Sequence, residues 1–535
     1  MSDSTASLAR SSAGMAAGTI ASRGLGVVRA ALQALAIGTA AAANGWEVAN
    51  TLPNIVYLLL AGGVLNSVLV PQITRSAAHA DGGRDYVDRL LTLAIGGIAL
   101  VTVLITAAAP LLVRLYASTL DPTTLHLSVT FAFICLPQIF FYGLYTVLGQ
   151  VLNARGQFAA FFWAPVAANV VFIAGLVAFI VLYPAQPSVA DYTTPMIWLL
   201  AGSATLSIAA QGLILVAPLW RSGFRFRPRW GFRGVGLRGA STVALWTFAA
   251  LAVSQLAFIV TSQVLGTVHG SDPGRASYSY AFLVFMLPHS LVTVSLVTAL
   301  FTRMSRAAHS DNLREVRRDV HQGLRMTAVV NIPASVGGML LGVYVTGTLY
   351  ILNSPEATRG IASIMIPMLA GLVPFGVVYL IQRVYYAFED ARTPFRLQVI
   401  ISVVATVTGL GALLLPDPWI GFGIGVGQTV SNLVGAVVGV IWVRHRLGGL
   451  PLGSITRSYV RLTLASLACA VPAAALAWAL TRAVHGRAQG PVVLLVAGSA
   501  FAVVYLLIAR RLRVREVDEL LGPLLGRARR ILPGR

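Results

Sequence analysis

The sequence predicts an all-α membrane protein of about fourteen transmembrane helices, and three observations support this. The chain of 535 residues is 57% hydrophobic and only 11% charged, whereas soluble domains contain roughly 25% charged residues. Apolar runs of about 20 residues, the length that a helix needs to cross a bilayer, recur along nearly the whole chain. The mean hydropathy of +0.78 is too high for a soluble core of this length. Little sequence is therefore left for a soluble domain.

Charges, prolines and glycines mark the ends of the expected helices. By these marks we place helices at residues 15–39, 47–73, 88–117, 124–152, 157–183, 194–219, 241–266, 277–303, 322–352, 359–388, 394–415, 418–443, 457–481 and 490–510. The stretch up to Gly14 is polar and does not resemble a cleaved signal peptide, because it has no apolar run before a small-residue cleavage site. We therefore expect the first helix to remain and to act as the signal.

The net charge of +21 is carried by arginine, because the chain contains no lysine. In a soluble protein this charge would suggest nucleic-acid binding, but here the arginines lie between apolar runs. They gather in one set of alternate loops. The opposite set is nearly free of arginine: 118–124 and 184–195 have none, and its other loops contain Arg275, Arg359, Arg482 and Arg487. The positive-inside rule then predicts that both termini lie in the cytoplasm. We expect an inner (plasma) membrane protein with no nucleic-acid partner. The basic loop 220–239 and the basic tail 513–535 are also suited to contacts with anionic membrane lipids.

Nothing in the sequence indicates an enzyme, and we expect a transporter instead. There is no ATP-binding P-loop, no zinc-protease motif, no pair of Cys or His ligands and no serine nucleophile elbow. Cys135 and Cys469 both lie within apolar runs, where cysteine usually serves as a small buried hydrophobic residue. We therefore expect no cofactor and no metal site. An ion gradient, the membrane potential or a downhill substrate would supply the energy for transport.

Two short motifs recur roughly 230 residues, or six expected helices, further along the chain. Leu52-Pro53-Asn54 recurs as Leu287-Pro288-His289, and 150–154 aligns with 383–387. An even number of crossings preserves orientation, so the two copies would be parallel repeats. We therefore predict a lobe of six helices at 1–230, a second lobe of six at 231–447, two further helices at 448–512 and a basic cytoplasmic tail at 513–535.

Two arginines lie inside the first expected helix, where an ionisable group costs about 2.5–3.5 kcal/mol on insertion scales. Arg23 and Arg29 are separated by six positions, with Gly24 and Gly26 between them. This spacing is about 120° around a helix, so a regular helix would not put both side chains on one face. Both can still line a wide cavity, particularly if the glycines bend the helix. Alternatively, each side chain can extend to the cytoplasmic surface.

Polar side chains also follow a helical spacing in other expected helices. Glu47, Asn50 and Asn54 fall at i, i+3 and i+7, which places them on one face of a helix that Pro53 can kink. The fourth and tenth helices have similar stripes, formed by Gln138, Tyr142 and Tyr145 and by Tyr379, Gln382 and Tyr386. Together the stripes suggest a shared hydrated interior. Hydrogen bonds between helices and aromatic belts at the membrane surface remain alternative roles.

Three stretches of the first two helices resemble the MurJ (MviN) family of lipid II flippases. They are Ser-Arg-Gly-Leu-Gly-Val-Val-Arg at 22–29, Ala-Asn-Thr-Leu-Pro-Asn at 49–54 and Gly-Gly-Val-Leu-Asn-Ser-Val-Leu-Val-Pro at 62–71. Tyr386-Ala387, Asp390 and Thr393-Pro394 match a further stretch of the family. The resemblance covers nearly the whole chain.

The resemblance implies a fold of the MOP superfamily, with two six-helix lobes around a cavity and a groove for a polyprenyl tail on the helices of 448–512. It implies that the substrate is lipid II, the undecaprenyl-pyrophosphate-linked peptidoglycan precursor. Alternating access would move it from the cytoplasmic to the periplasmic leaflet. Arg23 and Arg29 match cavity arginines of the family, which would hold the pyrophosphate, and guanidinium groups do bind phosphate oxygens strongly. Asn50, Asn54 and Glu47 would line or gate the cavity.

The chain departs from the family at some positions. Other members have cavity arginines where this chain has Tyr57 and Leu283, and the residues associated with sodium binding in some members have no clear counterpart near Thr261 or at 405–408. An exporter of drugs or polysaccharide precursors and a non-transporting membrane scaffold for cell-wall synthesis therefore remain alternatives. The expected partners are lipid II, membrane lipids and proteins of cell-wall synthesis or division.

Overall fold

The computed structural model describes residues 2–61, 84–155, 157–229, 242–270, 272–512 and 516. Nearly all of these residues are helical, and no strand occurs among them, which confirms the all-α prediction. Contacts between residues divide the chain into two compact units, Met1–Ser271 and Asp272–Arg535.

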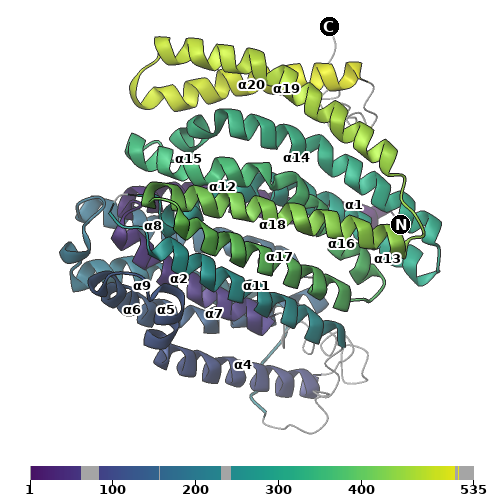
Figure 1. Ribbon diagram of the computed structural model, residues 1–535. Coiled ribbons are helices and arrows are strands. Elements are labelled where there is room, and N and C mark those ends of the chain that lie inside the picture. Colours follow the sequence, from purple (N-terminus) through teal and green to yellow (C-terminus); the bar gives the residue numbers. More distant parts are fainter. Residues whose placement is uncertain are drawn as a thin grey trace. The chain divides into compact units, whose positions relative to one another are not determined.

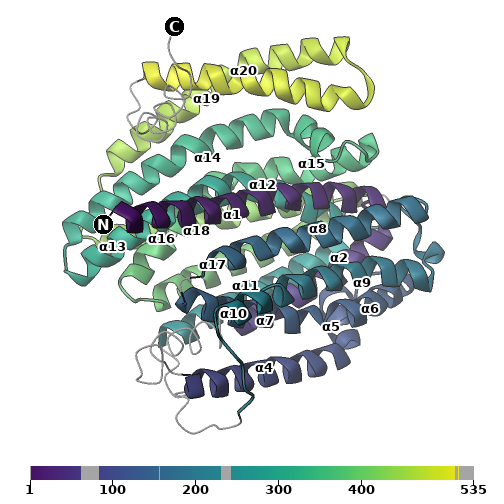
Figure 2. The ribbon, with the colours of Figure 1, turned by 180° about the vertical axis from the view of Figure 1, so that it is seen from behind.

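In the first unit, helices α1 and α8 lie along each other, and α8 also lies along α9 (Figure 2). Helix α2 packs mainly on α6, and α11 packs on α5. The elements are α1 (Ser2–Ile37), α2 (Ala41–Leu60), α4 (Arg84–Ala107), α5 (Ala109–Ala117), α6 (Pro122–Cys135), α7 (Gln138–Ala154), α8 (Ala159–Leu182), η2 (Val189–Asp191), α9 (Thr194–Leu213), α10 (Val216–Arg221) and α11 (Thr242–Gly266).

In the second unit, α19 and α20 lie side by side and pack against the long helix α14 (Figure 1). Tyr459 of α19 and Tyr505 of α20 donate hydrogen bonds to carbonyls of α14, at Leu324 (3.1 Å) and Val329 (2.7 Å). The elements are α12 (Arg275–Pro288), η4 (His289–Thr293), α13 (Val294–His309), α14 (Leu313–Leu349), α15 (Pro355–Ala370), α16 (Leu372–Ala387), α17 (Arg392–Gly411), η5 (Ala412–Leu414), α18 (Asp417–Arg446), α19 (Leu452–Ala483), η6 (Gly486–Ala488) and α20 (Gln489–Arg511).

Twelve helices in the described ranges are long and apolar enough to cross a membrane, or thirteen if the bent pair α15 and α16 counts as one span. The predicted number of about fourteen is therefore close. The one predicted span that is not among them, at 47–73, begins within α2. Its continuation at 62–73 lies outside the described residues.

Several predicted spans contain a break at a proline or a glycine. Helices α6 and α7 meet at Leu136-Pro137, α5 begins with Pro110 in its first turn, and α15 and α16 bend by 52° about Gly371. Proline has no backbone N–H and its ring clashes with the preceding turn, so an α-helix is interrupted or kinked there. By contrast, α1 continues as one helix through Gly24 and Gly26. The possible bend at these glycines therefore does not interrupt the helix.

Two helices begin with a capping side chain followed by a proline. Asp121 accepts hydrogen bonds from the backbone N–H groups of Thr123 (3.1 Å) and Thr124 (2.9 Å), ahead of α6. Ser354 accepts one from the N–H of Ala357 (3.2 Å), ahead of α15. The first N–H groups of a helix have no partner within the helix, and the proline at the first position removes one of them. These local sequences therefore determine where α6 and α15 start.

Of the two repeated motifs, only the second lies at equivalent helix ends. Pro53 lies within α2 and Pro288 is the last residue of α12, while 150–154 ends α7 and 383–387 ends α16. The lobe boundaries at 230 and 447 stay a prediction.

Close approach of α2 to α6 depends on a small residue, which is typical of helix contacts inside membranes. A Cβ added at Gly45 of α2 would lie 2.6 Å from the Ser128 Oγ and 3.1 Å from the Thr124 Cγ2, both on α6. The next residue, Trp46, is fully buried and contacts the rings of Phe131 (5.2 Å between centroids) and Phe172 (6.3 Å). Gly45 thus permits the contact that buries Trp46.

We expect Gly45→Val to destabilise the protein by about 1–3 kcal/mol, because the added side chain overpacks the contact between α2 and α6. Thermal unfolding of the purified protein measures this effect. Gly97→Val on α4 is the matched control, since a Cβ at Gly97 would have no neighbouring atom within 4 Å. Equal losses of thermal stability in the two variants would show that the contact at Gly45 is unimportant.

Candidate functional site

Arg29 is the centre of a cluster built from four helices of the first unit. Its side chain extends from α1, is half-buried, and its Cζ lies 5.9 Å from the centroid of the Phe172 ring on α8. Tyr142 of α7 and the Glu47 carboxylate of α2 lie in the electrostatic neighbourhood of the Arg29 guanidinium. The structure thus brings Arg29 and Glu47, both predicted site residues, together with two aromatic side chains.

The three predicted site residues of α2 differ in their surroundings. The helix is continuous through Pro53, so Glu47, Asn50 and Asn54 have the predicted spacing on one helix. Glu47 is half-buried and accepts a hydrogen bond from the Thr51 Oγ1 (3.1 Å). Asn50 is half-buried and Asn54 is exposed, and the side chain of neither has a hydrogen bond with the described residues. Only Glu47 therefore belongs to the cluster around Arg29.

An aromatic pair continues the cluster along α2 and α7. The rings of Tyr57 and Tyr142 are stacked, with 5.2 Å between centroids and 23° between planes. The Tyr57 hydroxyl is 2.6 Å from the Thr146 Oγ1, and the latter donates in addition to the Tyr142 carbonyl (3.1 Å). Tyr57, at a position where the resemblance led us to expect an arginine, is thus held by contacts with α7. It supplies a hydroxyl and a ring, but no charge.

Arg23 lies outside the cluster. It is half-buried on α1, and its side chain has no hydrogen bond or ion pair with the residues that the structure describes. A Cβ added at Gly24 or Gly26 would meet no atom within 4 Å, so this stretch of α1 borders open space. The structure therefore does not bring Arg23 and Arg29 into contact with a common group, but it leaves room beside the helix segment between them.

Asn169 links this stretch of α1 to α8. Its Nδ2 donates to the Ser22 carbonyl (3.0 Å) and lies 3.3 Å from the Ser22 Oγ. Asn169 is buried, and the residue after Ser22 is Arg23. This hydrogen bond therefore helps to position the backbone that carries Arg23.

Three further residues of the site were not among the predicted ones. Asn169 could have been identified from the sequence, because it is the one amide in the otherwise apolar helix α8. Phe172 and Thr146 are ordinary helix residues, and nothing in their local sequence distinguishes them. Only the packing of α7 and α8 brings them to the cluster.

Two other features singled out in the sequence, Leu283 and the polar stripe of the tenth expected helix, lie in the second unit. Leu283, like Tyr57 at a position where the resemblance led us to expect an arginine, is a half-buried residue of α12. In the predicted polar stripe of α16, the Tyr379 hydroxyl accepts a hydrogen bond from the Arg383 Nη2 (3.2 Å) of the same helix, and the Arg383 Cζ lies 4.9 Å from the Tyr379 ring centroid. The Tyr379 ring also contacts that of His289 in η4, with 5.1 Å between centroids. Sequence reasoning did not include Arg383 in this stripe.

The cluster around Arg29 is suited to binding an anion. A guanidinium group offers five N–H donors in a planar fork that matches phosphate oxygens. In the described part of the chain neither Arg23 nor Arg29 forms a salt bridge, although Glu47 is near enough to interact with Arg29. The donors of both side chains are therefore available to a ligand. The cluster can bind and orient such a ligand.

Comparison with known proteins shows similarity to one family over most of the chain. The family model described as "Lipid II flippase MurJ" matches residues 33–497. A probable lipid II flippase MurJ of Rhizobium meliloti (strain 1021) is 26% identical over 488 residues, which cover 88% of this chain and 86% of the relative. The lipid II flippase MurJ of Burkholderia cenocepacia is 25% identical over 428 residues, covering 78% of this chain and 80% of the relative.

Solved structures show the same fold. A lipid II flippase MurJ in an inward closed conformation matches with a TM-score of 0.71 and 18% identity, covering 93% of this chain and 99% of that chain. An inward-facing multidrug resistance MATE family transporter of the MOP superfamily matches with a TM-score of 0.61 and 16% identity, covering 78% of this chain and 94% of that chain. The predicted MOP-type architecture agrees with both similarities.

We expect Asn169→Leu to lower the stability of the protein by about 0.6 kcal/mol, the average for hydrogen bonds between membrane helices, and by at most about 1.7 kcal/mol. Ser22→Ala is the matched variant, and it should have a smaller effect because it keeps the bond to the Ser22 carbonyl. Thermal unfolding of both purified variants tests the order of the two effects. A larger loss in Ser22→Ala would contradict the assigned role of Asn169.

Proposed function

Because this chain belongs to the MurJ family of lipid II flippases, we infer that it moves lipid II across the membrane. It is a multi-pass membrane protein, and the family is one of transporters. We propose that transport runs from the cytoplasmic to the periplasmic leaflet of the inner membrane by alternating access. Both termini then lie in the cytoplasm, which the arrangement of arginines in alternate loops supports.

The observation that carries the proposed substrate site is the half-buried Arg29 in a membrane-spanning helix. A cation at this depth costs about 2.5–3.5 kcal/mol on insertion scales, so such residues usually face a cavity or a partner. Arg29 has an aromatic neighbour in Phe172 and a carboxylate in its vicinity, but no salt bridge in the described ranges. A doubly anionic pyrophosphate supplies the charge that would compensate this arginine.

Arg23 would form the second part of the same site. The open space beside Gly24 and Gly26 supports this, because a pyrophosphate group there could reach one arginine with each phosphate. Asn50, on the face of α2 that carries Glu47, would donate amide hydrogen bonds to the ligand, and the exposed Asn54 would contact it during entry or exit. Tyr57 would offer the ligand a hydroxyl at a position where the resemblance led us to expect an arginine.

Glu47 would compensate Arg29 when the site is empty. A carboxylate near the guanidinium lowers the cost of keeping that charge inside the membrane. When pyrophosphate binds, the same carboxylate repels it. Such opposition limits the affinity for the substrate, which is useful for a transporter because the substrate must also be released.

The polyprenyl tail of the substrate would lie along α19 and α20. Exposed apolar side chains on both helices support this, among them Leu464 and Val471 of α19 and Leu495 and Val503 of α20. Proteins of cell-wall synthesis or division are the proposed protein partners, since they supply or use lipid II on the two sides of the membrane.

In cells depleted of their own lipid II flippase, wild-type protein is expected to restore growth and lipid II translocation. The double variant Arg23→Ala/Arg29→Ala should fail to do so, because charge-assisted hydrogen bonds contribute about 1.5–3 kcal/mol each, or about ten- to a hundred-fold in affinity. Arg359→Ala is the control, since Arg359 is an exposed arginine of α15. Growth and the amount of lipid II in the outer leaflet are measured at equal expression.

The two possible failures are distinguishable. Absence of rescue by the wild type would refute the flippase function for this chain. Rescue by the double variant equal to that of the wild type would refute the roles of the two arginines and leave the flippase function standing.

We expect Glu47→Gln to bind lipid II about five-fold more tightly, because removal of a nearby negative charge is worth roughly 1 kcal/mol. Asn50→Asp makes the opposite change in charge one turn along α2 and should weaken binding by a similar factor. Titration of purified protein with lipid II measures both. Weaker binding by Glu47→Gln would show that the carboxylate helps to hold the substrate.

A further inference from the structure

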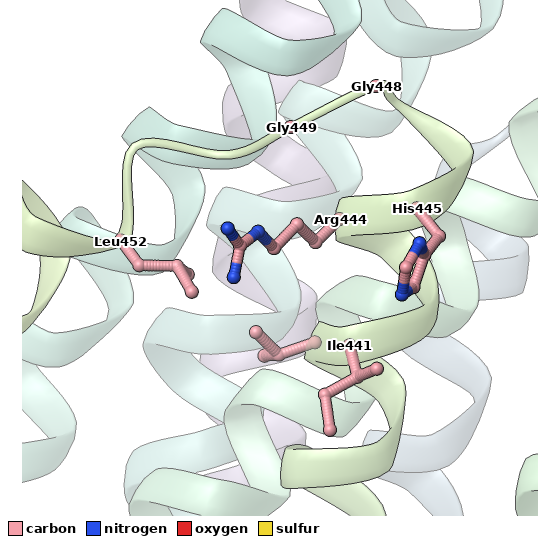
Figure 3. Close-up of a pocket in the computed structure, with 7 residues that line it drawn as sticks. Ile441, Arg444, His445, Gly448, Gly449 and Leu452 are labelled. Carbon is pink, nitrogen blue, oxygen red and sulfur yellow. The ribbon is translucent and has the colours of Figure 1, made fainter.

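A pocket of about 470 Å³ lies in the second unit, where α18 ends and α19 begins (Figure 3). Its basic lining residues are Arg444 and His445, and its apolar ones include Ile441 and Leu452. In Figure 3 the Arg444 side chain extends from the end of α18 toward Leu452, beneath the turn at Gly448 and Gly449. Arg444 therefore places its guanidinium inside the pocket. The cluster around Arg29 shares no residue with this pocket.

The local sequence forms the wall of this pocket through a glycine cap. The Gly449 N–H donates to the Arg444 carbonyl (2.8 Å) and the Gly448 N–H to the His445 carbonyl (3.2 Å). This is the Schellman arrangement, which needs a left-handed residue directly after the helix, and Gly448 has φ 64°. The cap ends α18 and turns the chain toward α19. Of the three basic residues in the last turn of α18, Arg444 and His445 line the pocket and Arg446 does not.

The charge of the pocket is positive. Arg444 and His445 are exposed, their side chains have no hydrogen bond or ion pair within the described ranges, and none of the lining residues is acidic. A helix C-terminus by itself disfavours anions, because its last carbonyls are unpaired. Here the cap satisfies two of them, and the Arg317 Nη2 of α14 donates to the Leu447 carbonyl. These bonds offset the negative end of the helix.

Apolar surface extends from the pocket along α18. Leu433, Val437 and Ile441 follow one another at intervals of four residues, and their side chains are 53%, 53% and 49% exposed. Residues at this spacing form one stripe on a helix. Because α18 and α19 are both membrane-spanning by length and composition, their junction lies at a membrane surface. The stripe therefore runs from the headgroup level into the hydrocarbon.

We propose that this pocket binds the phosphate of an anionic membrane phospholipid, with one acyl chain along the stripe of α18. The Arg444 guanidinium holds two phosphate oxygens, and His445 donates one ring N–H. The apolar walls and the stripe distinguish this occupant from a soluble phosphate, which would gain nothing from Ile441 or Leu452. Basic pockets between helices at the membrane surface are suited to such headgroups.

Thermal unfolding of the full-length protein in detergent tests the proposal. The protein is titrated with phosphatidylglycerol, with phosphatidylcholine or with inorganic phosphate. For the wild type we expect stabilisation by phosphatidylglycerol alone. Arg444→Gln should weaken the apparent affinity for this lipid about five-fold, as expected for one basic residue near a headgroup, and Arg444→Gln/His445→Gln should weaken it further.

Arg446→Gln is the matched control, because Arg446 lies in the same turn but outside the pocket, with its Cζ 4.9 Å from the Phe388 ring centroid. It should keep the affinity of the wild type. Unchanged affinity in the double variant, equal stabilisation by phosphatidylcholine, or equal stabilisation by inorganic phosphate would each overturn the proposal. Unfolding temperatures without lipid show separately whether a variant is damaged, and none of these results depends on transport.

Discussion

Backbone N–H and C=O groups find no water inside the hydrocarbon of a membrane, and this constraint underlies the whole architecture. Only a helix satisfies them locally, so a chain of apolar runs must fold as helices. Leu136, the residue directly after α6, still forms a helical hydrogen bond, from its N–H to the Ala132 carbonyl (2.8 Å). The next residue, Pro137, has no N–H to donate. Side-chain hydroxyls obey the same constraint, as when the Ser128 Oγ donates to the Thr124 carbonyl (2.7 Å) of its own helix.

The same environment changes what holds helices together. Lipid tails are as apolar as leucine, so burial of leucine contributes little to the association of helices, and close packing and hydrogen bonds become more important. Gly45 allows α2 to approach α6 closely, and Asn169 bonds α8 to the backbone of α1. Tyr505 likewise bonds α20 to the backbone of α14. Each of these bonds joins a side chain to a backbone carbonyl of a neighbouring helix, which makes the relative position of the two helices specific.

The arginines of the first helix are conspicuous against this background of satisfied polar groups. Most buried amide and hydroxyl groups bond to a neighbouring helix or to their own, whereas Arg29 contacts a ring and lies in the field of a carboxylate. Such an arrangement keeps the guanidinium donors available, at a cost that an anionic ligand would offset. The pocket at Arg444 likewise keeps the donors of a guanidinium available. It lies at the membrane surface, where a cation is less costly than in the hydrocarbon and headgroup phosphates are near.

The amino-acid sequence by itself determined the class of the fold, the approximate number of helices and the family. Apolar runs long enough to cross a membrane force a helix wherever they occur, and the Leu-Pro-Asn motif of α2 is local, so neither needs tertiary information. The spacing of Glu47, Asn50 and Asn54 was also predictable, because α2 is one helix.

Only the tertiary structure decided which residues meet. Arg29 and Glu47 share a cluster because α1 packs on α8 and α2 packs on α7. Arg23 remains outside it because it lies about 120° around α1 from Arg29, and Asn54 remains outside because it lies about two turns further along α2 than Glu47. Phe172, an ordinary residue of an apolar helix, becomes the neighbour of the arginine in the same way. Helical periodicity determines which residues share a face, but packing between helices distant in sequence decides what that face contacts.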